Sequence, residues 1–254
     1  IYDFNLPLNI SKIYNQKLTK FGDGIITFND IKIGTEMCEE LWVPQTQNQE
    51  LGLQGVHIIC NSSASHHQLN KLKYRIELIK NSNKKNGGVY IYSNLAGCDG
   101  NRIFFDGSSL ICCNGKFLSQ CSQFDISKLE VKSATINLKS INNYRSNSKS
   151  RGVQASQIEF FPEIKVDKYL CNSNNNISNN IELKIYSKME EMIYGPALWL
   201  WDYLRKSGLN GFFLPLSGGS DSSSTAIIVF SMCKILFDKF KIIKDDLRRI
   251  IQDK

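Results

Sequence analysis

The segment Ile31-Lys32-Ile33-Gly34-Thr35-Glu36-Met37-Cys38-Glu39-Glu40-Leu41-Trp42 passes from an apolar strand pattern into the start of a helix. A cysteine at such a junction lies at a sharp turn beside unpaired backbone N–H groups, which stabilise a thiolate and can bind an oxyanion. The neighbouring carboxylates oppose thiolate formation, so a cation and a base would have to come from elsewhere in the fold. Taken alone, a lone cysteine after an apolar strand is more often a core residue than a nucleophile.

Short strand patterns surround this junction. Residues 24–28 and 31–37 flank a predicted tight turn at Asn29-Asp30, and Asn114-Gly115 is a strong hairpin signal. A helix is predicted where Leu69, Leu72, Ile76 and Ile79 share one face. The other predicted strands cover residues 56–60, 88–94, 108–113, 116–124 and 129–138. Hairpins with a helix laid on them favour a layered α/β domain over a purely parallel sheet.

The last third of the chain changes character. Residues 172–176 are polar and of low complexity, which predicts a linker or surface insertion. A helix is expected over residues 189–204, with Pro196 tolerated only near a first turn or at a kink. A short strand over residues 211–216, a Gly-Ser loop and a buried apolar helix from residue 223 to about 240 should follow. Strand, glycine-rich loop and helix in this order predict the start of a nucleotide-binding domain.

The loop is Pro215-Leu216-Ser217-Gly218-Gly219-Ser220-Asp221-Ser222-Ser223. Paired glycines before a helix N-terminus let backbone N–H groups converge on phosphate, and the serines add hydroxyl donors. Asp221 would either cap the helix or order a magnesium ion. The loop lacks the Gly-Lys-Ser/Thr ending of a P-loop, which excludes γ-phosphate transfer of that type. The alternative is a simple strand-to-helix turn with a Ser/Asp cap.

Composition narrows the class of protein. The 254 residues carry a formal net charge of +7, but Lys and Arg are scattered, which indicates a basic surface or phosphorylated ligands and no nucleic-acid partner. No apolar run approaches bilayer length and no secretion signal is recognisable, so no membrane partner is expected. The eight cysteines show no metal-binding spacing, so no metal ligand is assigned, and they predict a reduced protein in the cytoplasm.

Two motifs carry a resemblance to known families. Ser-Gly-Gly-x-Asp-Ser at residues 217–222 is similar to the pyrophosphate loop of the ATP pyrophosphatase superfamily, and residues 34–41 resemble the nucleophile elbow of the nitrilase superfamily. Together they resemble the glutamine-dependent NAD synthetases of the eukaryotic type, which join these two domains. Further matching phrases follow in the family's order at residues 61–67, 87–92, 97–100, 106–107, 120–124, 150–156, 195–204 and 211–216.

The resemblance implies an α/β fold in two parts. Residues 1–165 would form the C-terminal portion of a nitrilase-like α-β-β-α sandwich, the glutaminase domain. Residues 166–187 would be a linker. Residues 188–254 would start a Rossmann-like ATP pyrophosphatase domain.

The resemblance also implies the chemistry and the site residues. Cys38 would attack the carboxamide of glutamine, and Ser217 would act with the rest of residues 215–222 around the ATP phosphates. ATP is then a substrate together with deamido-NAD and Mg²⁺, and no prosthetic group is expected. Ser65 and Lys71 match positions of the amide pocket, and Glu39 would orient the glutamine ammonium. The alternative for Lys71 is a solvated helix residue without a role in binding. The alternative for Glu39 is a charge that only stabilises the start of a helix.

The chain departs from a complete enzyme of this type. The Glu and Lys of the nitrilase site lie upstream of the elbow in this family, and nothing before Cys38 matches them. We therefore expect an internal fragment, inactive by itself, of a protein that forms homo-oligomers at full length. One alternative is a nitrilase-type amidase with a regulatory nucleotide-binding domain, and the other is a non-catalytic fragment.

Overall fold

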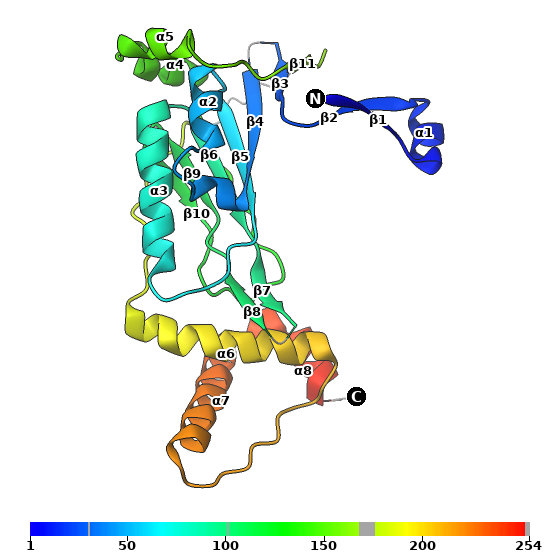
Figure 1. Cartoon of the computed structure of the whole chain (residues 1–254). Helices are drawn as coiled ribbons and strands as arrows, with labels where there is room; N and C mark the ends of the chain where they lie inside the picture. Colours follow the sequence, from blue (N-terminus) through cyan, green and yellow to red (C-terminus); the bar gives the residue numbers. More distant parts are fainter. Residues whose placement is uncertain (30, 101, 168–175, 252–254) are drawn as a thin grey trace.

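The computed structural model describes residues 1–29, 31–100, 102–167 and 176–251, and it has an α/β fold (Figure 1). Its main sheet has seven strands in the order β10-β9-β6-β5-β4-β3-β11. The strands β4, β5 and β6 are parallel, and the flanking pairs β3–β4, β6–β9 and β9–β10 are antiparallel. Their bounds are β3 Ile25–Phe28, β4 Ile31–Met37, β5 Ile58–Ser63, β6 Val89–Asn94, β9 Leu110–Cys113, β10 Lys116–Gln120 and β11 Glu163–Lys165.

Turn residues set two of the antiparallel pairs. Asn114 (φ 50°) and Gly115 (φ 79°) both adopt positive φ between β9 and β10, as a two-residue hairpin turn of this kind requires. Asn29 (φ 50°) lies between β3 and β4, while Asp30 is outside the described residues. Both predicted hairpins are therefore confirmed.

Two helices cover one face of the sheet (Figure 1). They are α2 (Gln47–Leu53) and α3 (Lys71–Asn86). The helix α3 carries Leu72, Ile76 and Ile79 of the predicted apolar stripe, but Leu69 precedes the helix and is exposed. The alternate residues of β6 that point to this face, Tyr90 and Tyr92, are fully buried with Leu72 and Ile79 of α3. Each such buried side chain stabilises the fold by about 1.5–3 kcal/mol.

Two arginines hold the edge of this layer. They come from α4 (Leu138–Ser146) and α5 (Ser150–Ala155). Arg145 donates to the carbonyl oxygens of Val56 at 2.6 Å, Gly87 at 3.0 Å and Asn86 at 3.1 Å. Arg151 donates to Asn86 at 2.9 Å. Burial, and then the charge of Arg151, lower the pKa of Arg145 to about 10.

The C-terminal helices form a second cluster against a small hairpin. The helix α6 (Lys188–Ser207) begins at a capping box, in which Ser187 accepts the Glu190 N–H and Glu190 accepts the Ser187 N–H. Trp201 is buried in this cluster, as predicted. The hairpin consists of β7 Ala96–Asp99 and β8 Ile103–Asp106, and the other helices are α7 Ser220–Asp238 and α8 Phe240–Ile251. At the opposite end of the chain, three elements project from the sheet: β1 Tyr2–Asn5, α1 Leu8–Tyr14 and β2 Leu18–Phe21 (Figure 1).

Several sequence predictions were wrong. Residues 129–138 and 211–216 form no strand, because neither segment hydrogen-bonds to a neighbouring strand within the described residues. The strand predicted over residues 56–60 runs on as β5 through the polar Asn61 and Ser63. Pro196 lies inside α6, away from its first turn, so the first-turn alternative is wrong, while a kink at Pro196 stays a prediction. The helix α7 is largely exposed, with Phe230 at 66% and Phe237 at 82%.

The predicted linker, residues 166–187, lies partly outside the described residues, since 168–175 are not described. Its later part runs along β10. The Ile181 N–H donates to the Phe117 carbonyl at 2.9 Å, and Gln120 exchanges two hydrogen bonds with the Lys184 backbone. This part is therefore fixed to the edge of the sheet.

We predict that Arg145→Met lowers the free energy of unfolding by about 2 kcal/mol or more, because three carbonyl groups lose a charged donor. Urea unfolding followed by circular dichroism measures the change. Lys139→Met, on the exposed side of the same helix, is the control and should stay within about 0.5 kcal/mol of the unaltered protein. Equal unfolding midpoints for both variants would contradict the role given to Arg145.

Candidate active site

Cys38 lies at a strained turn between β4 and a short 3-10 helix, η1 (Cys38–Leu41). Its φ of 39° is unusual for a residue other than glycine, and such conformations cost on the order of 1–3 kcal/mol. The Glu40 carboxylate accepts the Met37 N–H at 2.6 Å and fixes the turn. The half-buried thiol is thereby presented beyond the end of the strand, as the sequence predicted.

A buried carboxylate supports this turn from below. Glu36 is 2% exposed and accepts hydrogen bonds from Asn48 at 2.7 Å and from the Tyr90 hydroxyl. Burial raises the pKa of Glu36, and these hydrogen bonds oppose the rise. The contacts tie β4 to α2 and β6. Sequence analysis did not assign Glu36 a role, although a carboxylate on the inward face of an apolar strand was the available signal.

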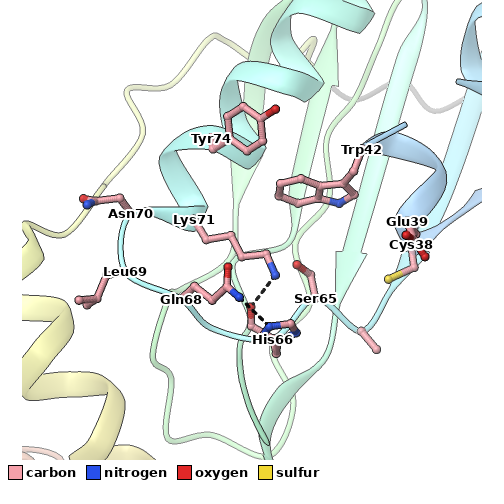
Figure 2. A pocket seen from close by; sticks show the side chains of 11 residues that line it. Cys38, Glu39, Trp42, Ser65, His66, Gln68, Leu69, Asn70, Lys71 and Tyr74 are labelled. Carbon is pink, nitrogen blue, oxygen red and sulfur yellow. Dashed lines mark hydrogen bonds between the residues drawn. The ribbon is translucent and has the colours of Figure 1, made fainter. Parts of the chain in front are cut away.

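The thiol faces a cavity of about 580 Å³ (Figure 2). One wall is η1, and the other is the segment between β5 and α3 together with the first turn of α3. The lining residues are Cys38, Glu39, Trp42, Ala64, Ser65, His66, Gln68, Leu69, Asn70, Lys71 and Tyr74. The structure therefore brings Cys38, Glu39, Ser65 and Lys71, all predicted from the sequence, to one cavity.

Lys71 supplies a cation to this cavity. Its ammonium donates to the His66 carbonyl at 3.1 Å and lies 5.5 Å from the centroid of the Trp42 ring. Figure 2 shows it reaching between Trp42 and the Ser65 segment. Burial, and then the nearby charge of Arg75, lower the pKa of Lys71. Glu39 contributes an exposed carboxylate next to Cys38.

Ser65 is held by a buried ion pair. Its hydroxyl accepts from Arg75 at 3.3 Å, and Arg75 also donates to Asp106 at 3.1 Å, with both charged side chains fully buried. The backbone of Ser65 exchanges two hydrogen bonds with the Asn94 side chain. Burial acts to raise the pKa of Asp106, but the hydrogen bond with His67 and the charge of Arg75 hold this pKa below its ordinary value. Arg75 was missed in the sequence, where it interrupts the apolar stripe of α3.

A thiol, a hydroxyl, a cation and a carboxylate thus converge on one cavity. The thiol can attack a carbonyl carbon, and the two charges can bind opposite charges on the same ligand. This arrangement fits a zwitterionic molecule with an amide or ester group. The described part of the chain holds no group of three or more His, Cys, Asp or Glu side chains placed to bind a metal ion.

The Gly-Ser loop, residues 215–222, lies apart from η1 and α3, the elements that line this cavity (Figure 1). Its residues 215–219 precede α7, and residues 220–222 belong to the first turn of that helix. Gly218 has a φ of 82°, and the Gly219 N–H donates to the Ser217 hydroxyl at 3.4 Å. The Ser217 hydroxyl lies 3.1 Å from that of Ser222. The predicted order of loop and helix is confirmed, but the helix begins at Ser220 and not at Ser223. The loop is exposed, and the described residues 211–216 before it form no strand.

The seven cysteines within the described residues are free thiols, and Cys98, Cys112, Cys113 and Cys121 are buried. Cys171 lies outside those residues. Among the helices that the structure describes, none combines the length and apolarity needed to cross a bilayer.

Residues 9–146, more than half of the chain, match the carbon-nitrogen hydrolase family. The chain is 45% identical over 245 residues to the glutamine-dependent NAD(+) synthetase of Saccharomyces cerevisiae, covering 94% of this chain and 34% of that protein. It is 44% identical over 234 residues to the Bos taurus protein of the same name, covering 91% of this chain and 33% of that protein. The chain therefore spans about a third of the length of these curated relatives.

Two solved structures share the fold. The glutamine-dependent NAD(+) synthetase of Cytophaga hutchinsonii superposes with a TM-score of 0.62 at 23% identity, covering 97% of this chain and 32% of that one. The glutamine-dependent NAD(+) synthetase of Acinetobacter baumannii, in complex with adenosine diphosphate, superposes with a TM-score of 0.61 at 21% identity, covering 90% of this chain and 36% of that one. The predicted α/β, nitrilase-like fold is confirmed by this likeness and by the family match. With its strand-to-helix cysteine turn inside the matched region, the chain belongs to the carbon-nitrogen hydrolase family.

Proposed function

We propose that this chain is the part of a glutamine-hydrolysing NAD synthetase that holds the glutaminase nucleophile and the first ATP-binding loop. The observation that carries the proposal is the Cys38 turn facing a cavity that also contains Ser65, Lys71 and Glu39. The similarity to proteins named glutamine-dependent NAD(+) synthetase supports it. The proposed parts are a glutaminase portion (1–165), a linker (166–187) and an ATP-binding portion (188–254).

In the glutaminase portion, the Cys38 sulfur attacks the carboxamide carbon of glutamine. A thioester forms, the C–N bond breaks and ammonia leaves; water then cleaves the thioester, which frees glutamate and restores the thiol. In this proposal the Lys71 ammonium binds the α-carboxylate of glutamine and Glu39 binds its α-ammonium, which their positions in the lining of the cavity support. Ser65 supplies a hydroxyl whose orientation Arg75 fixes.

In the ATP-binding portion, the carboxylate of deamido-NAD attacks the α-phosphate of ATP and pyrophosphate leaves. Ammonia then displaces AMP and NAD forms. Backbone N–H groups of residues 217–220, next to the positive end of the α7 dipole, suit the ATP phosphates. Ser217 and Ser222 add hydroxyl groups. Asp221, an exposed carboxylate in the first turn of α7, would help to hold Mg²⁺, and the ion would neutralise charge on the ATP phosphates.

The setting of the protein follows from the same proposal. It acts in the cytoplasm as a homo-oligomer, on glutamine, ATP and deamido-NAD, without a prosthetic group and without nucleic acid or membrane as a partner. The scattered basic residues and the free thiols are consistent with this setting.

In the intact protein, Cys38→Ala should lower glutamine-dependent NAD synthesis by more than about a thousandfold, because the thioester cannot form. Synthesis from ammonium chloride should persist, because free ammonia needs no thioester. The measurement is NAD formed from deamido-NAD and ATP with each nitrogen source. Cys60→Ala, at a half-buried free thiol of β5, is the control and should keep both activities.

If Cys38→Ala still uses glutamine, the nucleophile is another cysteine. If the folded variant also loses ammonium-driven synthesis, the model of two separate sites is wrong. Glutamine hydrolysis with no pyrophosphate release in the unaltered protein would favour the amidase alternative.

Gly219→Val should abolish AMP formation with either nitrogen source while glutamine hydrolysis persists. A Cβ at Gly219 would meet only the Ser217 hydroxyl at 3.5 Å, so the free loop tolerates a side chain that bound phosphate would not. Gly211→Val is the matched control, since a Cβ there meets nothing within 4 Å. If Gly219→Val leaves the affinity for ATP unchanged, the loop does not bind phosphate and only caps the helix.

A further inference from the structure

A buried carboxylate on α6 contacts the wall of the Cys38 cavity from outside it. Glu191 is 1% exposed. One of its oxygens accepts the backbone N–H of Asn70 at 2.7 Å, and the other accepts the side-chain amide of Gln123 at 3.3 Å. Asn70 lines the cavity and directly precedes Lys71. Glu191 therefore bonds to the backbone one residue before the cation of the site.

The same carboxylate reaches the cavity by a second route. Gln123 donates to Asp106 at 2.9 Å, and Asp106 pairs with Arg75 at 3.1 Å. Arg75 donates in turn to the Ser65 hydroxyl at 3.3 Å. Each of these side chains is buried, so the contacts are shielded from solvent and sensitive to the loss of a partner. Glu191 thus connects to both the Lys71 and the Ser65 sides of the cavity.

The start of α3 needs this external partner. Asn70 occupies the cap position with a φ of 63°, and its side chain makes no capping hydrogen bond. The Asn70 N–H donates to the Glu191 carboxylate, and a carboxylate near a helix N-terminus also interacts favourably with the helix dipole. Figure 2 shows Asn70 at this start of α3, on the side where α6 passes. Without Glu191, the cap residue of α3 would lose its hydrogen bond to α6.

We propose that Glu191 is a positioning residue for the binding of glutamine. Glu191 holds the backbone of Asn70, and thereby keeps the adjacent Lys71 where the α-carboxylate of glutamine binds. The proposal rests on the function proposed above. It means that the glutamine pocket is completed by a residue from outside residues 1–165, on the helix α6, which packs against α7.

The test compares variants of the intact protein by their KM and kcat for glutamine and by ammonium-driven NAD synthesis. Glu191→Ala should raise KM for glutamine by about tenfold to a hundredfold, with a smaller change in kcat, because binding and not thiol attack is affected. Glu191→Gln keeps the shape and one acceptor oxygen, so a smaller rise is expected. Ammonium-driven synthesis should stay unchanged in both variants.

Asp202→Asn is the matched control. Asp202 is also a buried carboxylate of α6, and it accepts the Cys98 backbone N–H at 2.6 Å, but it does not line the Cys38 cavity. This variant should lose stability without a change in KM for glutamine. An equal rise in KM for Asp202→Asn and Glu191→Gln would show only general damage to α6 and would overturn the proposal.

A double variant separates positioning from structure. If Glu191 acts through Lys71, Glu191→Ala should add little to the rise in KM caused by Lys71→Met. Fully additive effects, or an unchanged KM in folded Glu191→Gln and Glu191→Ala, would overturn the proposal. If the unaltered protein makes no NAD from glutamine but folds, the proposed function has failed instead, and the two failures remain distinct.

Discussion

The buried ion pair between Arg75 and Asp106 is the contact on which the pocket depends. Both side chains are fully inaccessible, so each charge needs the other, and removing one partner of such a pair typically costs about 3–5 kcal/mol. Arg75 also lies 5.3 Å from the Tyr92 ring centroid and donates to Ser65 and to the Gly107 carbonyl. One guanidinium thereby fixes α3, the end of β8 and a wall of the cavity relative to one another.

Buried carboxylates extend this arrangement in two directions. Glu36 ties the Cys38 turn to α2 and β6, and Glu191 ties the start of α3 to α6. The apolar core between the sheet and α3 supplies most of the stabilisation, as expected for side chains such as Leu72 and Tyr90. Stability and geometry are thus divided, with apolar burial holding the layers together and a few paired charges placing the reactive groups.

The two functional motifs meet very different conditions. The Cys38 turn follows directly on Met37, which pairs with Ser62 of β5 and donates its N–H to Glu40, so the strain of the turn is held by surrounding structure. The Gly-Ser loop is exposed, and its hydrogen bonds join its own residues to one another and to the first residues of α7. The glutamine side of the proposed reaction therefore has a formed cavity within the described chain, and the phosphate side has a loop and a helix terminus.

Local sequence alone determined the hairpins at Asn29 and Asn114, the turn at Cys38 and the presence of a helix after the Gly-Ser loop, because turn chemistry and apolar periodicity act over a few residues. Only the tertiary structure decided that residues 129–138 and 211–216 form no strand, since a strand exists only where a neighbour accepts its hydrogen bonds. It also decided the roles of Glu36, Arg75 and Glu191. Glu191 contacts a residue 121 positions away, and no local pattern specifies a partner at that distance.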